Sequence, residues 1–387
     1  MSTDLARPIA PGTPSSAAAR RPARSLSRPA DLIRGLGPNW YASVMGTGIV
    51  ATAAATLPVQ VPGLRAFATV VWLACAAWLV TLTAAFAVQV TRHRGAARGH
   101  ALDPVMVQFY GAPPMAALTV GAGALLLGPA VIGTGAAVAV DAVLWTAGTL
   151  TGIASTIAVP YLMFTRGGAR SDAAFGGWLM PIVPPMVSAA TGALLVPYIP
   201  AGQARLTMLL ACYAMFGVSL LATLMVLPQI WLRLVRHSVG PAVMVPTLWI
   251  VLGPLGQSVT AANQLGAVAH LALPDPYATA FAAFGIVYGV PVWGFAALWA
   301  ALAAALTIRA AREHLPFALT WWSFTFPVGT CVTAATGLAL HSGSGAFAWV
   351  AAASYLGLVT AWAIVTARTA RGAARGSLFA PALAQQA

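Results

Sequence analysis

The chain has 387 residues, of which 59% are hydrophobic and only 7% are charged, and its formal net charge is +13. A soluble domain carries roughly 25% charged residues, so this chain has too few charges to cover a water-exposed surface. The composition therefore excludes an ordinary soluble protein. The positive charge alone would suggest nucleic acid as a partner, but the positions of the arginines give it a topological meaning, and no nucleic acid is expected.

The two ends of the chain differ from its middle. Residues 1–30 are rich in Pro, Ala, Ser and Arg and lack the apolar core of a signal peptide. We expect a disordered basic arm over residues 1–34 and a similar flexible tail over residues 369–387. The transmembrane domain is expected to occupy residues 35–368.

Ten apolar stretches follow one another along this middle region, each long enough, or nearly so, to cross a hydrocarbon core of about 30 Å. They span residues 39–57, 64–90, 105–127, 136–162, 176–199, 206–232, 243–271, 277–308, 316–341 and 346–367. Backbone groups in lipid must be satisfied within their own segment, so each stretch is predicted to be a helix. The expected fold class is an all-α polytopic membrane protein with ten transmembrane helices.

The arginines predict the orientation of these helices. With ten crossings, eighteen of the 20 basic residues fall on one side of the membrane, and Arg65 and Arg205 fall on the other. The positive-inside rule places the eighteen in the cytoplasm. Both termini are then cytoplasmic, and the expected location is a bacterial-type inner (plasma) membrane.

The odd-numbered stretches share helix-breaking residues about eight to ten residues after their cytoplasmic start, which is about 12–15 Å deep, near the bilayer midplane. Proline kinks a helix, and freed carbonyls at this depth are tolerated where they face protein or a water-filled cavity. Broken helices at matching places indicate a transport site. Ordinary kinking for helix packing is the alternative explanation. Gly and Pro also occur in the eighth stretch, which weakens the contrast between odd-numbered and even-numbered stretches. The candidate pore-lining or helix-break residues are Gly46, Thr47, Gly48, Pro113, Pro114, Pro184, Pro185, Pro254, Gly256, Pro327, Gly329 and Thr330.

This pattern predicts five helical hairpins with the odd helices inside and the even helices outside. The odd stretches contain no Asp, Glu, Lys or Arg, so their polar groups are hydroxyls, amides and broken-helix backbone. The N-termini of half-helices present N–H groups and a positive dipole end, which favours anion passage. The polar side chains available on the odd stretches are Thr47, Ser188, Thr191, Gln257, Ser258, Asn263, Thr330 and Thr333.

Three titratable residues lie within or at the ends of the stretches. Asp141 is about one turn inside the outer end of the fourth stretch. We expect a hydrated or hydrogen-bonded structural carboxylate there, with a functional role as the alternative. His270 and His341 end the seventh and ninth stretches on the outer side, where we expect solvated helix ends, or alternatively a pH-sensitive outer mouth. No Cys/His cluster or mid-membrane histidine pair occurs, so no metal, haem or other cofactor is expected, and an enzyme is disfavoured.

Two motifs carry a resemblance to a known family. They are Trp-Trp-Ser-Phe-Thr-Phe-Pro at 321–327, and Asn-Trp-Tyr at 39–41 joined to Met-Gly-Thr-Gly-Ile at 45–49. Over roughly residues 35–368 the chain resembles the tellurite-resistance/dicarboxylate transporter family, which includes slow anion channels, the tellurite-resistance protein, and malate and sulfite transporters. The resemblance implies a central pore lined by the odd-numbered helices, assembly as a homotrimer, and Phe326 as a ring that plugs the pore at mid-membrane. A core phenylalanine that packs a kink is the alternative for Phe326.

The resulting hypothesis is a membrane anion channel or facilitator, not an enzyme. It would pass small anions of the sulfite, C4-dicarboxylate or halide/nitrate class through the pore gated by Phe326, because a bare aromatic ring blocks hydrated ions. A proton-coupled secondary transporter for C4-dicarboxylates or sulfite is the alternative. It needs a titratable group near the path, and Asp141, His270 and His341 are the candidates.

Overall fold

The structure is a computed structural model that describes residues 29–166 and 172–379. Every regular element within these two ranges is a helix, so the all-α prediction is confirmed for them. Five of the helices are long: α3 (Leu64–Arg92), α7 (Thr134–Arg166), α9 (Gln203–His237), α11 (Tyr277–Arg312) and α13 (Gly345–Ala374). Only 17–33% of the residues in their most apolar windows are buried, so most of their apolar side chains are left to face lipid.

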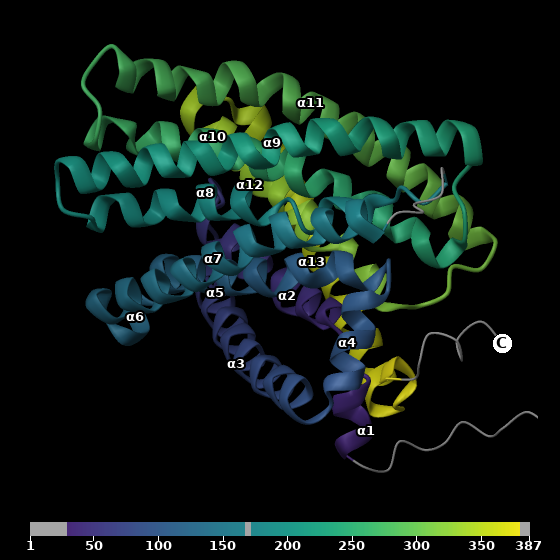
Figure 1. Cartoon of the computed structure of the whole chain (residues 1–387). Helices are drawn as coiled ribbons and strands as arrows, with labels where there is room; N and C mark the ends of the chain where they lie inside the picture. Colours follow the sequence, from purple (N-terminus) through teal and green to yellow (C-terminus); the bar gives the residue numbers. More distant parts are fainter. Residues whose placement is uncertain (1–28, 167–171, 380–387) are drawn as a thin grey trace, which may run out of the picture.

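Five shorter helices alternate with these: α2 (Tyr41–Thr56), α5 (Ala112–Leu127), α8 (Pro184–Leu195), α10 (Leu252–Val268) and α12 (Phe326–Ser342). Each packs against the long helix that follows it in the chain, which makes five hairpins (Figure 1). The short helices also pack against one another in the order α2, α5, α8, α10, α12 and back to α2, so they form a closed inner ring. The predicted inside and outside positions therefore match this packing.

Helix length alone identifies fewer membrane crossings than the five hairpins do. Eight helical segments in the described ranges are long and apolar enough to cross a membrane. The other two members of the ring, α2 and α8, have 16 and 12 residues and fall short of that length on their own. Short 3₁₀ segments extend them at their ends: η1 (Pro38–Trp40), η3 (Gly176–Leu179) and η4 (Val196–Tyr198). Ten crossings remain a prediction.

The predicted breaks coincide with the starts of four inner α-helices. The 3₁₀ segments η2 (Met106–Gly111), η5 (Ala242–Val251) and η7 (Leu319–Phe324) lead into α5, α10 and α12, and η3 precedes α8. Proline occupies one of the first two positions of α5, α8 and α12, where its missing N–H has no intrahelical partner to lose. In α7, α9 and α11, by contrast, the helix continues through an internal proline.

Helix α2 departs from the predicted pattern, because it runs unbroken through Gly46, Thr47 and Gly48. This segment has no proline, so every backbone donor stays available for the helix. Its glycines instead allow close approach of neighbouring helices. A Cβ atom at Gly46 would collide with the side chain of Thr325, and one at Gly48 would lie 2.6 Å from Cγ2 of Thr119.

The last residues of the predicted N-terminal arm are helical. Residues 1–28 lie outside the described ranges, but Pro29–Arg34 forms a short helix, α1. Gln89 of α3 fixes its end: its side-chain nitrogen donates to the carbonyls of Ile33, Arg34 and Leu36 at 2.9, 3.1 and 2.6 Å. The assignment of residues 29–34 to a disordered arm was therefore wrong, because a buried amide in α3 satisfies the carbonyls at the end of this helix.

The first residues of the predicted C-terminal tail are also helical. Helix α13 continues to Ala374 and is followed by η8 (Ser377–Phe379), while residues 380–387 lie outside the described ranges. The ring of Phe379 stacks on Trp40 with 4.9 Å between centroids. Apolar contact with the start of α2 thus orders residues that sequence composition assigned to a flexible tail. The two ends of the described chain meet beside α1 (Figure 1), as an even number of crossings requires.

Candidate functional site

A small cavity of about 30 Å³ lies inside the ring, with space for one or two water molecules. Residues from all five inner segments line it, which makes it the point where the ring converges. The lining residues are Ala42, Met45, Phe109, Met115, Met180, Val183, Ile250, Gly253, Pro254, Leu319, Trp322, Ser323, Phe326 and Pro327. Most of these come from the 3₁₀ segments or the first turns of the α-helices, so the cavity occupies the half of the ring near the chain termini.

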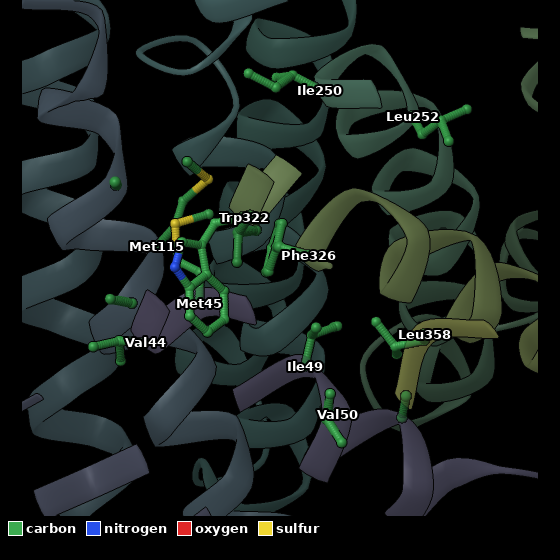
Figure 2. Close-up of a cluster of buried hydrophobic side chains, with 14 of the residues drawn as sticks. Val44, Met45, Ile49, Val50, Met115, Ile250, Leu252, Trp322, Phe326 and Leu358 are labelled. Atoms are coloured by element: carbon green, nitrogen blue, oxygen red, sulfur yellow. The ribbon is translucent and has the colours of Figure 1, made fainter. Parts of the chain in front are cut away.

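Phe326 forms part of the cavity wall as the first residue of α12, and only 5% of its surface is exposed. Figure 2 shows its ring beside Trp322 and in the same cluster as Met45 and Met115. Thioether, indole and phenyl groups offer little to replace the hydration shell of an ion. The cavity wall around Phe326 therefore offers few ligands for an ion.

Four α-helices start around the cavity. Val183, the residue before α8, lines it, as do Met115 in the first turn of α5, Gly253 at the second position of α10, and Phe326 at the start of α12. The N-terminal end of an α-helix carries roughly half a positive charge. The first turns of these four helices contain no acidic residue, so no carboxylate of their own neutralises these ends. The arrangement gives a cavity of apolar surface a potential that favours anions.

The candidate residues from the sequence divide into those that reach the cavity and those that do not. Phe326, Pro254 and Pro327 line it. Pro114 and Pro184 instead meet the outer helix α7, since a Cβ atom at Gly152 would lie 3.6 and 2.8 Å from their Cβ atoms. Pro113 is half-buried and Pro185 is buried, and neither belongs to the cavity wall.

Three further candidates lie at contacts between ring helices. A Cβ atom at Gly256 of α10 would come within 2.6 Å of the Thr330 carbonyl carbon in α12. The Thr330 hydroxyl is fully buried and lies 3.1 Å from the carbonyl oxygen of Leu252, to which it can donate. Gly329 lies against Ile49 of α2. These residues set the spacing of the ring helices.

The remaining polar side chains of the ring mostly bond to other helices. The indole of Trp362 in α13 donates to the hydroxyl of Thr47 at 3.1 Å, so this candidate faces an outer helix. Thr333 shares a hydrogen bond of 2.8 Å with Thr260 in α10. Similar bonds between helices hold Ser188 to Thr149, Ser258 to Tyr288 and Asn263 to the carbonyl of Gly285. The sequence correctly identified polar groups on the inner helices but not the side to which each one points.

Asp141 differs from its prediction. Its side chain is fully buried, and neither carboxylate oxygen has a hydrogen-bond partner among the residues that the structure describes. A Cβ atom at Gly121 of α5 would collide with Oδ1 of Asp141, so the carboxyl group points at the ring helix rather than at the membrane surface. The expected hydrogen bond is therefore not made by any described residue, and hydration of the carboxylate stays a prediction.

The two outer histidines are both exposed. His270 lies in η6 (Ala269–Leu271), just after α10. His341 lies in the last turn of α12, with Nδ1 at 2.9 Å from the carbonyl oxygen of Gly337 in the same helix. Neither is near the cavity wall.

A larger cavity of about 560 Å³ lies outside the ring, between α11 and α13. Its walls are mainly tryptophan, alanine and valine, and no lining residue carries a charge. One lining residue, Trp321, lies under the guanidinium of Arg368 at 4.7 Å from the ring centroid. Two α-helices begin at this recess, α10 at Leu252 and α12 close to Val328, against four at the smaller cavity.

Comparisons with known proteins agree with this geometry. The profile of a family described as voltage-dependent anion channel (SLAC1) matches residues 35–370. The chain is 28% identical to the sulfite efflux pump SSU1 of Arthroderma otae over 352 residues, 88% of this chain and 92% of that protein. It is 28% identical over the same shares to the sulfite efflux pump SSU1 of Trichophyton rubrum. It is also 26% identical to an uncharacterized transporter of Methanocaldococcus jannaschii, over 78% of this chain and 83% of that protein.

The family match covers the whole helical ring and its outer helices, and the relatives are anion or uncharacterized transporters. It also agrees with the resemblance carried by the motifs at 39–49 and 321–327. The chain is a multi-pass membrane protein that belongs to the voltage-dependent anion channel (SLAC1) family of anion transporters.

Proposed function

We propose that this protein is an anion channel or facilitator in which small anions pass along the axis of the inner ring and Phe326 closes the path. The observation that carries the proposal is the convergence of four α-helix starts on one apolar cavity. The helix ends favour a negative charge without a fixed cationic side chain, so an anion is attracted but not held tightly. Such weak binding suits conduction, which requires that the ion can also leave.

Sulfite is our first candidate for the transported anion. Two relatives that align with nearly the whole chain carry the name sulfite efflux pump. C4-dicarboxylates and the halide/nitrate class remain the alternatives, because helix ends recognise negative charge rather than one particular anion.

We place the protein in a bacterial-type inner membrane with both termini in the cytoplasm. The eighteen arginines assigned to one side support this orientation through the positive-inside rule. The contact between Phe379 and Trp40 supports an even number of crossings, which ten would satisfy. Assembly as a homotrimer of separate pores follows from the family resemblance.

Proton-coupled transport is the second candidate, and Asp141 favours it. A buried carboxylate charge without a partner is costly in a membrane protein, so such a group is suited to gaining and losing a proton as its neighbours move. Its contact with Gly121 would link that change to α5 of the ring.

The central test is Phe326→Ala in proteoliposomes loaded with sulfite or chloride, with flux measured with and without a pH gradient. We expect a rise in flux of about tenfold or more, because removing the phenyl ring opens the apolar level that it occupies. Phe324→Ala is the matched control, since Phe324 lines the outer cavity and packs against Trp249 at 5.5 Å. Equal flux through wild type and Phe326→Ala, with both proteins folded, would remove the gate from the proposal.

A further inference from the structure

Gln257 differs from the other polar side chains of the ring. Most of those bond to a second helix or to the backbone of their own helix, as in Thr191, whose hydroxyl donates to Val187. Gln257 is only 5% exposed, yet its carboxamide makes no hydrogen bond to any residue that the structure describes. Neither of its polar atoms is among the fully enclosed unpaired atoms of the described residues, so the carboxamide borders space that water or a ligand can occupy.

The register of α10 shows where this carboxamide points. Gly253 lines the cavity, and a Cβ atom built on it would meet nothing within 4 Å. In an α-helix a residue four positions later lies about one turn along the same face, roughly 6 Å further on. Gln257 therefore faces the axis of the ring one turn beyond the cavity, on the side away from the chain termini. Gln264, which is half-buried, shares this face near the far end of the helix.

The neighbouring positions of α10 support this direction. Ser258 is turned outward to Tyr288 of α11 and bonds to it at 2.8 Å. Thr260 bonds to Thr333 of α12. Ala261 and Leu265 pack in the apolar cluster that α10 shares with α8 and α9. With its neighbours on these sides accounted for, the face of α10 that carries Gln257 is directed inward.

We propose that Gln257 is an anion-binding residue of the path, located one turn beyond the Phe326 constriction, and that it favours oxyanions that carry a proton. Its amide nitrogen has two diverging N–H donors, one of which can donate to an oxygen of the anion. Its carbonyl oxygen can accept a hydrogen bond from an anion that carries a proton, such as hydrogen sulfite. A spherical halide can use the donors but not the carbonyl.

This inference rests on the proposed function, because it places Gln257 in the same path. It is more specific, since it names the residue that discriminates between anions after they pass Phe326. An uncharged donor also fits the rest of the ring, which carries no Arg or Lys to trap an anion.

The test uses the full-length protein in planar bilayers, with Phe326→Ala as the open background. Reversal potentials under nitrate/chloride and sulfite/chloride gradients are compared for Phe326→Ala alone and for Phe326→Ala with Gln257→Leu. We expect the permeability of sulfite relative to chloride to fall about tenfold, the factor that a change of 1.4 kcal/mol produces. The permeability of nitrate relative to chloride should change less, because nitrate has no proton to donate to the carbonyl oxygen. Gln257→Asn, which keeps the amide on a shorter side chain, should restore part of the ratio.

Gln229→Leu in the same background is the matched control. Gln229 is an exposed residue of the outer helix α9 and bonds to the carbonyl of Met225 in its own helix at 3.0 Å. It should leave the permeability ratios unchanged. Equal ratios with and without Gln257→Leu would overturn the inference.

A second measurement separates this inference from the proposed function. Thermal unfolding of purified wild type and Gln257→Leu, each with and without nitrate or sulfite, reports anion binding directly. We expect these anions to raise the Tm of wild type and to have a much smaller effect on Gln257→Leu. Protection of wild type alone, without current through Phe326→Ala, would support the binding site and contradict the channel. Equal protection of both proteins would contradict the site.

Discussion

Gly329 lies directly against Ile49, so that a Cβ atom at position 329 would collide with the Ile49 side chain. Gly329 follows Phe326 by three residues in α12, and Ile49 lies in the middle of α2. This contact closes the inner ring, because it joins the last ring helix to the first. The position of Phe326 therefore depends on how closely these two helices approach.

Gly329→Ala is expected to separate α12 from α2 and to lower stability. Overpacking of this kind costs about 1–3 kcal/mol, because the new methyl group meets a branched side chain that is itself buried. Thermal unfolding in detergent measures the change. Gly294→Ala in α11 is the control, since a Cβ atom there meets nothing within 4 Å, and it should be neutral or slightly stabilising. Equal Tm values for the two variants would show that the ring tolerates the added methyl group.

Helix positions could be predicted from the sequence because lipid imposes a length and forbids unsatisfied backbone. The second stretch was expected over 64–90, and α3 spans Leu64–Arg92. Proline also predicted where α5, α8 and α12 begin. The first stretch, expected over 39–57, contains α2, but the break expected within it is absent, because glycine without proline does not break a helix that neighbouring helices hold in place.

The direction of each polar side chain could not be predicted, because it depends on which neighbouring helix offers a partner. Thr47 was expected near the pore, but the indole of Trp362, 315 residues later in the chain, bonds to it. Gln257 could have been singled out by its spacing of four residues from Gly253. That signal becomes useful only once Gly253 is known to face the cavity.

Gln89→Leu is expected to loosen the N-terminal helix α1. The substitution leaves the carbonyls of Ile33, Arg34 and Leu36 without the side-chain donor that they now share. A lost partner for buried carbonyls costs about 1–3 kcal/mol. Hydrogen exchange over residues 29–40 should become faster in the variant, while α10 should be unaffected. Unchanged exchange over residues 29–40 would mean that packing alone holds α1.

Acidic pH is expected to destabilise the short helix α4 (Arg94–Leu102) through His100. Burial lowers the pKa of His100 below its ordinary value of 6.5, and nearby Asp103 opposes this shift more weakly. Nδ1 of His100 is also buried without a partner among the described residues, so an added proton there has no acceptor. The folded protein thus binds fewer protons at this site than the unfolded chain. The contribution of neutral His100 to the stability of the fold is complete above pH 6.5. It is lost as the pH falls from 6.5 toward the lower pKa that His100 has in the folded protein.

Hydrogen exchange over α4 at about pH 7.5 and about pH 5.5 measures this effect, after correction for the intrinsic pH dependence of exchange. Wild type should lose protection at the lower pH, and His100→Gln should show a smaller loss, because its side chain does not titrate. An equal loss in both proteins would assign the acid sensitivity to another group.

Asp141→Asn distinguishes the two proposed modes of transport. Asn has nearly the shape of Asp but cannot exchange a proton, so the variant removes titration at the contact with Gly121 while keeping the packing of α7 on α5. For a channel, we expect sulfite flux in proteoliposomes, corrected for the protonation equilibrium between sulfite and hydrogen sulfite at each pH, to be the same with and without an imposed pH gradient, in both wild type and the variant. The flux itself should stay within about twofold, because Asp141 does not line the cavity and a neutral replacement adds no charge there.

Wild-type uptake that depends on the gradient and disappears in Asp141→Asn would contradict the channel and assign proton coupling to this carboxylate. Gradient-dependent uptake that survives the substitution would contradict both the channel and that role for Asp141, leaving His270 and His341 as the next groups to test.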